Sequence, residues 1–309
     1  MAKRISIINF KGGVGKTTLA FHLGTGLARY YDSRVLLIDM DHQSSLSIIC
    51  LGHKIWDNVV DDGLVVDRVF EPFFGQQLSI TSEQAIVKKP KKGHFYKCMD
   101  IVPASLSLDD VEIELTSSSQ GNAVKSEWNK RTLVCKWIME TGIDDVYDYI
   151  IFDCPPATKI VSQNAIAASH GFVIPVVPEA VMERGAPHLR GLIQSGIDKM
   201  LNELAPLNDK LPTYVPDTKL AGVVITRIAS SSGYSGYTND HTRHLKSLEN
   251  EWKNDLLKPY IPQGTGVSEC LARGVPVYDE PLSQNIGQRG INKDYEQLTG
   301  HLKSRIDRI

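Results

Sequence analysis

The sequence predicts an α/β fold in which a mostly parallel, twisted sheet is covered by helices on both faces. The first observation is a set of short apolar runs, rich in β-branched residues, that do not alternate between apolar and polar side chains. Such runs are typical of strands buried on both faces of a parallel sheet. The second observation is that stretches with helical periodicity separate them. Leu19, Leu23 and Leu27, for example, recur at every fourth position and mark one face of a helix.

The predicted strands and helices follow one another along the chain. Strands are predicted at residues 5–10, 35–39, 100–103, 149–153, 171–177, 220–226 and 260–262, and helices at residues 17–31, 106–115 and 128–141, with a polar break at 117–121. Residues 52–98 carry few periodic runs, and residues 229–240 are rich in serine, glycine and tyrosine. We therefore expect one domain over residues 1–309, with an insertion at about 52–98 and an exposed loop at about 229–240.

The composition is that of an ordinary globular protein, since 42% of the 309 residues are hydrophobic and 23% are charged. The net charge of -2 does not by itself indicate nucleic-acid binding, so any basic surface must be local. Five dispersed cysteines, without a C-x-x-C pair, fit a reducing cytoplasm better than a disulfide framework. No apolar run reaches the roughly 18 residues of a membrane-spanning helix. The sequence enters a strand at once, so we expect no secretory signal.

A glycine-rich loop, Lys-Gly-Gly-Val-Gly-Lys-Thr-Thr at residues 11–18, joins the first predicted strand to the first predicted helix. Its glycines let backbone N–H groups turn inward as an anion-binding nest, and the helix N-terminus adds its positive dipole end. Lys16 is placed for the β- and γ-phosphates of a nucleotide, and the Thr17 hydroxyl for Mg²⁺. Phe10 stands where the general phosphate-loop pattern has its first glycine, so this loop is a variant. The alternative is a glycine-rich turn without a ligand.

The variant loop resembles the deviant Walker A box of the ParA/MinD superfamily. Residues 38–43, Ile-Asp-Met-Asp-His-Gln, resemble the second acidic box of that family, and residues 151–156, Ile-Phe-Asp-Cys-Pro-Pro, resemble its Walker B segment. Weaker similarity continues at residues 176–179, 222–227, 261–262 and 268–277. The resemblance implies a P-loop NTPase fold of the deviant Walker A type. It also implies ATP and Mg²⁺ as cofactors, and a slow, partner-stimulated hydrolysis of ATP to ADP and phosphate.

The resemblance further implies roles for individual residues. In this family Lys11 reaches across an ATP-sandwich dimer to the partner's phosphates, and Gly12 lies at the subunit contact. Lys16 and Asp41 complete the implied catalytic set, with Asp41 positioning the attacking water. The implied magnesium-binding residues are Thr17, Asp39 and Asp153. The implied nucleotide-binding residues are Lys11, Gly12, Gly13, Val14, Gly15, Lys16, Thr17, Thr18, Glu179, Thr226, Arg227 and Pro262.

The sequence departs from the family pattern at two positions, where His42 replaces the usual proline and Ser44 replaces the common glycine. Structural alternatives also remain open. Lys11 fits a solvated surface charge, Asp41 fits a helix N-cap, and the last three nucleotide-binding candidates fit ordinary packing at strand ends. Cys154 is interpreted as a passenger at a variable position of the Walker B segment.

The two branches of the superfamily differ in what the ATP-bound dimer binds. ParA-type members bind non-specific DNA and position plasmids, chromosomes or protein assemblies, whereas MinD-type members bind the membrane through a C-terminal amphipathic helix. The tail carries Tyr295, Leu298, Leu302, Ile306 and Ile309 at helical spacing. Such a stripe fits a membrane face but also fits packing on the protein's own core. Because the tail lacks Trp and Phe, membrane binding is the less favoured alternative.

Basic residues of the C-terminal third are the candidates for DNA binding, and each also fits a solvated surface charge. They are Arg243, Lys246, Lys253, Arg273, Arg289 and Lys293. The lysines within residues 88–92 either contribute to such a surface or solubilise a loop. The glycine loop starts only ten residues in, so we expect no N-terminal helix-turn-helix domain and no operator-specific repression.

The leading hypothesis is a cytoplasmic, nucleoid-associated ATPase of the ParA type. Its homodimer would bind DNA when loaded with ATP and would partition or position a cargo with a ParB-like or other adaptor that stimulates hydrolysis. The cargo would be a plasmid, a chromosome region or a protein body such as a carboxysome. One alternative is a MinD-like ATPase on the membrane surface. Another is a metabolic P-loop enzyme of the dethiobiotin-synthetase type, against which Lys11 argues because such enzymes do not need a cross-subunit lysine.

Overall fold

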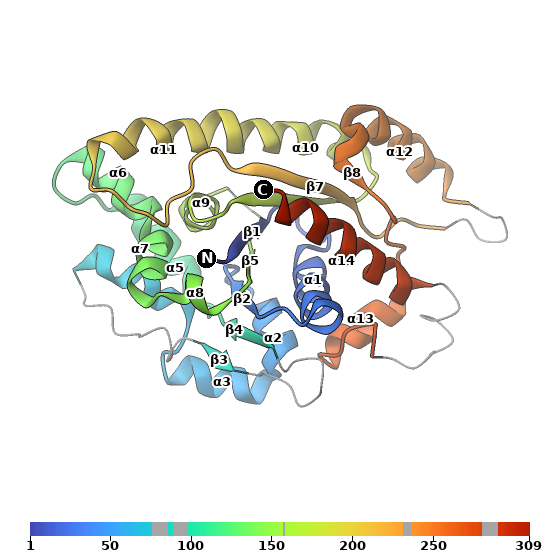
Figure 1. The fold of residues 1–309 in the computed structure, drawn as a ribbon, viewed down its shortest axis with the longest axis horizontal. Coiled ribbons are helices and arrows are strands. Elements are labelled where there is room, and N and C mark those ends of the chain that lie inside the picture. The colour runs from blue at the N-terminus through green and yellow to red at the C-terminus, as the bar shows by residue number, and fades with distance from the viewer. Residues whose placement is uncertain (76–85, 89–97, 157, 231–235, 280–289) are drawn as a thin grey trace.

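An eight-stranded sheet forms the centre of the molecule in the computed structural model, which describes residues 1–75, 86–88, 98–156, 158–230, 236–279 and 290–309 (Figure 1). The strands are β1 Lys3–Ile7, β2 Val35–Asp39, β3 Val87–Lys88, β4 Met99–Val102, β5 Tyr149–Asp153, β6 Gly171–Val176, β7 Lys219–Ile225 and β8 Leu256–Leu257. Their order is β3-β4-β2-β5-β1-β6-β7-β8, and every neighbouring pair is parallel except β3 with β4. The predicted fold class is confirmed.

Helices of very different lengths connect the strands. They are α1 Lys16–Tyr31, α2 Ser45–Leu51, α3 His53–Asp61, η1 Val66–Phe74, α5 Leu108–Ser117, α6 Ala123–Arg131, α7 Leu133–Thr141, α8 Ile143–Val146, α9 Ile160–Ala167, α10 Ala180–Gly191, η3 Leu192–Asp198, α11 Lys199–Leu204, η4 Ala205–Leu207, α12 Asn239–Trp252, η5 Lys253–Asp255, α13 Thr265–Ala272 and α14 Ile291–Asp307. In Figure 1, α10 to α11 form one long rod along an edge of the molecule.

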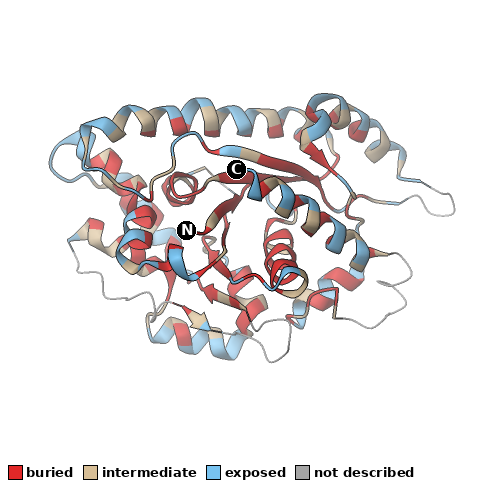
Figure 2. Ribbon diagram, viewed as in Figure 1, coloured by how far each residue is buried: buried red, intermediate tan, exposed pale blue. Residues whose placement is uncertain are grey.

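The strands are buried on both faces, as Figure 2 shows for the centre of the sheet. In β5, Ile150 and Phe152 join the core beneath η1 and α5 to α12, whereas Tyr149 and Ile151 join the core beneath α1, α2, α3, α13 and α14. Successive side chains of a strand point to opposite faces, so a strand buried on both sides needs apolar residues at every position. This requirement explains the continuous apolar runs of the sequence.

Two predictions of secondary structure were wrong. The strand predicted at residues 260–262 is not a sheet strand, since the last strand is β8, and Pro262 forms only an isolated bridge with Ile228. The helix predicted at residues 128–141 is two helices, α6 and α7, which meet at Thr132, whose hydroxyl donates to Trp128 O at 2.8 Å. Periodicity continues across such a break because both helices bury one face.

The segment at residues 52–98, in which the sequence shows few periodic runs, contains the helices α3 and η1. In η1, Val66, Val69, Phe70 and Phe73 are buried in the core. The mainly 3₁₀ turn geometry of η1 places side chains three residues apart on one side, which a search for the α-helical period misses. The rest of this predicted insertion lies largely outside the described residues, as do residues 231–235 of the predicted loop.

The C-terminal helix α14 packs on α1 and β7. Tyr295, Leu298, Leu302 and Ile306 are buried there at 4% exposure or less. The apolar stripe of the tail therefore faces the protein's own core and is not available to a bilayer. Among the described residues, no helix combines the length and the apolar character needed to cross a membrane.

Candidate phosphate-binding site

The glycine loop connects the end of β1 to the start of α1, and its backbone explains its glycines. Gly13 and Gly15 have φ angles of +72° and +81°, a left-handed conformation that a side chain disfavours. Gly15 is the N-cap of α1, so the loop delivers its amides to the positive end of that helix. Apart from its two neighbours in the chain, no described residue has an atom within 4 Å of the place a Cβ of Gly12 would occupy. The fold of one chain therefore does not require a glycine at position 12.

Lys16 lies at the floor of the loop and is only 7% exposed. Its Nζ donates to the carbonyl oxygen of Lys11 at 3.2 Å. Burial lowers the pKa of the Lys16 ammonium, and the nearby carboxylates of Asp153 and Asp41 oppose that shift. A buried ammonium with one backbone acceptor retains two N–H donors for an anion.

Asp39 and Asp153 stand side by side at the carboxyl edge of the sheet, as register partners on β2 and β5. Both Asp153 carboxylate oxygens are buried and accept no hydrogen bond of normal geometry from the described residues, although the Thr17 hydroxyl lies close enough to act on the carboxyl. Burial and the neighbouring Asp39 raise the pKa of Asp153 well above its ordinary value, while Thr17 and Lys16 oppose the rise. An unpartnered buried carboxyl beside a threonine hydroxyl is the oxygen set that Mg²⁺ prefers, so these residues fit that ion.

The carboxylate of Asp39, unlike that of Asp153, accepts several hydrogen bonds. Its Oδ2 accepts from the Ser47 N–H at 2.9 Å and the Ser47 hydroxyl at 2.7 Å, and its Oδ1 accepts from the Asp41 N–H at 3.1 Å. Burial raises the pKa of Asp39 to about 7 despite these bonds. Asp39 thus satisfies the first turn of α2 and orients the backbone of Asp41. The helix-capping role that was an alternative for Asp41 falls to Asp39.

Asp41 is half-buried, and its Oδ1 accepts from the Gln43 N–H at 3.0 Å in a tight turn. His42 Nδ1 lies 3.6 Å from the same oxygen. Ser44 then adopts a φ of +51° with its side chain fully buried. This left-handed conformation explains why glycine suits the position in the family pattern and why serine is strained there.

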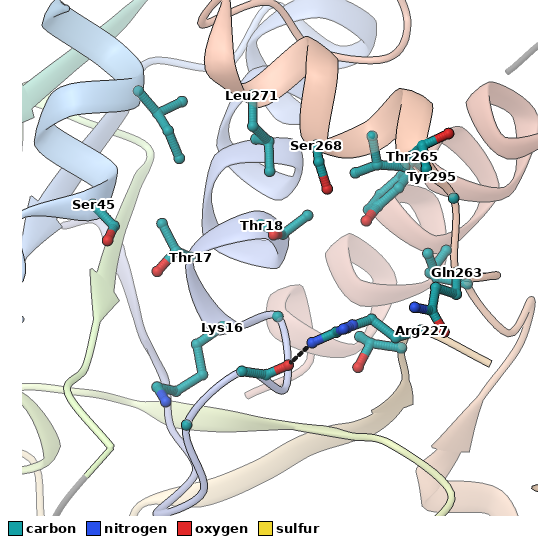
Figure 3. Close-up of a pocket in the computed structure, with 18 of the residues that line it drawn as sticks. Lys16, Thr17, Thr18, Ser45, Arg227, Gln263, Thr265, Ser268, Leu271 and Tyr295 are labelled. Atoms are coloured by element: carbon teal, nitrogen blue, oxygen red, sulfur yellow. Dashed lines mark hydrogen bonds between the residues drawn. The ribbon is translucent and has the colours of Figure 1, made fainter. Parts of the chain in front are cut away.

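A cavity of about 800 Å³ opens above the loop (Figure 3). The predicted site residues that line it are Gly12, Gly13, Gly15, Lys16, Thr17, Thr18, Asp41, Thr226, Arg227 and Pro262. Asp39 and Asp153 are buried at the strand ends and do not line it. Val14 is buried too, and its carbonyl accepts the Thr226 hydroxyl at 2.7 Å.

Arg227 also braces the loop. Its guanidinium donates to Gly13 O at 2.6 Å, drawn as the dashed line in Figure 3, and its backbone has a φ of +53°. Thr226 and Arg227 are therefore held against the loop's backbone carbonyls. Both residues lie on the cavity wall, and their hydrogen bonds are with the loop itself.

Lys11 and Glu179 lie on the other side of the loop and line a separate cavity of about 170 Å³. Their side chains form an ion pair, with Nζ of Lys11 on Oε2 of Glu179. Glu179 is the N-cap residue of α10. Lys11 is therefore neither a free surface charge nor directed at the main cavity of its own chain.

Comparison with known proteins places this site in a family. A family model described as an AAA domain matches residues 2–205. The chain is 30% identical over 304 residues to a ParA family protein of Chlamydia pneumoniae, covering 97% of each sequence. The chain belongs to the ParA family. Among other ParA relatives, it is 29% identical over 283 residues to the sporulation initiation inhibitor protein Soj of Bacillus subtilis, covering 90% of each.

Solved structures share the ParA-type fold. The ATP complex of a variant of Cyanothece McdA superposes with a TM-score of 0.70 at 18% identity, covering 98% of this chain and 96% of that one. Cobyrinic acid a,c-diamide synthase of Mycobacterium smegmatis, with an ATP analogue and magnesium, superposes at 0.66 with 21% identity, covering 97% and 93%. At such identities the likeness establishes the fold.

The cavity of this ParA family member has a second half that the sequence did not assign to nucleotide binding. Its further lining residues are Gln43, Ser45, Ile49, Pro156, Ile261, Gln263, Gly264, Thr265, Val267, Ser268, Leu271 and Tyr295. The family-like segments at 261–262 and 268–277 were the available signal for α13. No local pattern marks Tyr295 as a cavity residue, because its helical stripe indicates core packing.

The DNA-binding candidates are spread over three helices. Arg243 and Lys246 lie on α12, Lys253 directly follows it, Arg273 follows α13 and Lys293 lies in the first turn of α14; all five are exposed. Arg243 lies 3.5 Å from the Asp240 carboxylate. Arg289 lies outside the described residues, as do the lysines at 89, 91 and 92.

Proposed function

We propose that this ParA family protein binds Mg-ATP, dimerises around it and hydrolyses it slowly, so that the nucleotide controls binding to non-specific DNA. The observation that carries the proposal is the meeting of Lys16, Thr17 and the unpartnered Asp153 at the foot of a cavity that Asp41 also lines. The ATP and magnesium of structurally similar proteins support the same ligands here.

Each residue then has a defined task. The loop amides and Lys16 bind the β- and γ-phosphates. Thr17 and Asp153 would hold Mg²⁺, which supplies positive charge at the phosphates when bound. Asp39 holds the backbone of Asp41, and the Asp41 carboxylate orients the attacking water and accepts its proton.

Dimerisation is supported by the outer side of the loop. Gly12 is exposed and unconstrained by its own chain, so a close approach of a second copy would explain its small size. Lys11 would leave Glu179 and contact the partner's phosphates, adding a positive charge as the transition state forms. A metabolic P-loop enzyme does not need a lysine in that position.

DNA binding follows from the family and from the exposed basic residues of α12 to α14. Several lysines and arginines acting on phosphates suffice for binding without sequence preference, and such binding weakens steeply with salt. An adaptor that stimulates hydrolysis would then release the dimer and couple the cycle to a plasmid, a chromosome region or a protein body. The buried stripe of α14 makes a MinD-like membrane tail the weaker alternative.

A paired assay tests this function. Fluorescence anisotropy with random-sequence duplex DNA should detect binding with ATP but not with ADP, and raising salt from about 50 to about 200 mM should reduce it at least tenfold. Liposomes of anionic lipid should bind in neither state. Replacing Arg243, Lys246 and Lys253 by alanine should weaken DNA binding, whereas replacing the exposed Lys125, Lys136 and Lys210 should not. Liposome binding together with no DNA binding at low salt would reverse the choice of branch.

A further inference from the structure

One end of the main cavity, beside α13, contains the hydroxyl of Tyr295. Tyr295 is only 4% exposed, yet its hydroxyl makes no hydrogen bond with any described residue. It lines the cavity together with Thr265 and Ser268 of α13. Figure 3 shows the hydroxyl end of the ring on the side facing Ser268 and Thr18. Because this hydroxyl lines the cavity and makes no bond within the described part of the chain, it is available to hydrogen-bond a ligand held there.

The ring of Tyr295 is held in place by His22, one helical turn beyond Thr18 on α1. The two rings are stacked with centroids 4.1 Å apart and an interplanar angle of 22°. His22 Nε2 accepts from the Val277 N–H at 3.3 Å, so its proton lies on Nδ1, which donates to Thr18 O at 2.8 Å. Burial lowers the pKa of His22 to about 4, so the imidazole is neutral. Both ring nitrogens of His22 are hydrogen-bonded, so the imidazole is fixed in the orientation against which Tyr295 stacks.

The position of this group relative to the phosphate loop suits the far end of a nucleotide. Lys16 and Thr17 mark where the phosphates lie under the proposed function. Tyr295 stacks on His22. His22 lies one helical turn beyond Thr18, a distance of about 6 Å along the axis of α1. The hydroxyls of Thr265 and Ser268 lie at the same end of the cavity. Hydroxyls both donate and accept, so they match the mixed donors and acceptors along the edge of a nucleobase.

We propose that Tyr295 binds the base or ribose end of the nucleotide through its hydroxyl, with His22 as the residue that positions it. The inference rests on the proposed function, because it concerns the same nucleotide. It makes α14, the last helix of the described chain, part of the nucleotide site. Tyr295, a member of the apolar stripe of the tail, would then have two roles. Its ring packs in the core, and its hydroxyl binds the ligand.

Calorimetric titration of Tyr295→Phe with Mg-ATP and with magnesium tripolyphosphate tests this inference. Tripolyphosphate offers only the phosphate groups, so its affinity should not change, whereas ATP affinity should fall about fivefold to tenfold with the loss of one hydrogen bond. Without ligand, the variant should melt at or above the wild-type temperature, because the removed hydroxyl has no partner. The matched control is Tyr278→Phe, since Tyr278 also contacts His22 but does not line the cavity; its ATP affinity should stay at the wild-type value.

The outcomes separate this inference from the proposed function. Unchanged ATP affinity in Tyr295→Phe, or an equal loss for ATP and tripolyphosphate, would overturn the role of Tyr295 and leave the ATPase function standing. Failure of the wild-type protein to bind ATP would instead remove the proposed function itself.

Discussion

Lys11, at the start of the phosphate loop, forms an ion pair with Glu179, at the N-cap of α10 in the same chain. The two side chains retain 33% and 40% of their exposure, so the pair is modest in energy, about 1 kcal/mol or less. A lysine expected to contact a partner subunit is therefore held by its own chain before any partner arrives.

Glu179→Gln should release Lys11 and favour the ATP-bound dimer. Each of the two protomers gives up one pair of at most about 1 kcal/mol, which corresponds to a shift of up to about thirtyfold in the dimerisation constant. Sedimentation velocity with a non-hydrolysable ATP analogue measures it, and Glu203→Gln on the exposed face of α11 is the matched control. A weaker dimer in Glu179→Gln would indicate that Glu179 contributes to the interface or to the nucleotide instead.

Gly12→Val should block dimer formation while leaving the monomer intact. A Cβ at this position meets no atom within 4 Å among the described residues beyond its chain neighbours, so the melting temperature and ATP affinity of the monomer should stay near wild type. Light scattering should then find monomers with an ATP analogue that dimerises the wild-type protein. Normal dimerisation of the valine variant would exclude Gly12 from the subunit contact.

Lys16→Ala should lose ATP binding, by about a hundredfold or more, because a buried ammonium that hydrogen-bonds to phosphate is removed. Equilibrium dialysis with labelled ATP measures the affinity. Lys199→Ala, an exposed lysine on α11, serves as control. An unchanged affinity would refute the assignment of the phosphate loop.

Asp41→Ala should keep ATP binding, accumulate the dimer and lose turnover by about 10²–10⁴-fold, as expected for removal of a general base. Because the Asp41 carboxylate also closes a turn with Gln43, Asp41→Asn is the sharper variant, since it keeps an acceptor and removes the charge. Phosphate release under single-turnover conditions is the measurement. Turnover at the wild-type rate in both variants would exclude a catalytic role.

The acidic pair predicts how stability depends on pH in the absence of nucleotide. The pKa of Asp39 is raised from 3.8 to about 7, and that of Asp153 is raised well above its ordinary value. A carboxyl with a higher pKa in the folded chain stabilises it below the unfolded pKa, and this contribution is lost as pH rises toward the folded pKa. The protein should therefore lose stability between about pH 4 and about pH 7.

Asp153→Asn isolates this effect, because the amide cannot ionise. Its melting temperature at about pH 8 should exceed that of wild type by a few degrees. The rise in melting temperature on adding Mg-ATP should be smaller than for wild type. Scanning calorimetry at about pH 5 and about pH 8 checks both, with the exposed Asp209→Asn as control. A variant that is less stable than wild type at both pH values would contradict the inference that ionisation of Asp153 destabilises the nucleotide-free protein.

The sequence by itself determined the parts of this protein that are local in the chain. The phosphate loop, the start of α1 and the strand ends at Asp39 and Asp153 each depend on a few consecutive residues. Glycines at 13 and 15 are required by the backbone angles of the loop itself, and apolar runs are required by burial on both faces of the sheet. Such constraints are visible in the order of the residues, and the family resemblance was confirmed by relatives that align over nearly the whole chain.

Only the tertiary structure decided how distant segments complete the site. It paired Lys11 with Glu179, placed Asp39 under α2 through Ser47, and brought Tyr295 to the cavity from a helix that begins at Ile291. Periodicity marked Tyr295 as a core residue, which is true of its ring but not of its hydroxyl. A pattern of apolar positions reports which face of a helix is buried. It carries no information on which single polar atom of that face meets a cavity, because the packing of α14 on α1 and β7 determines that.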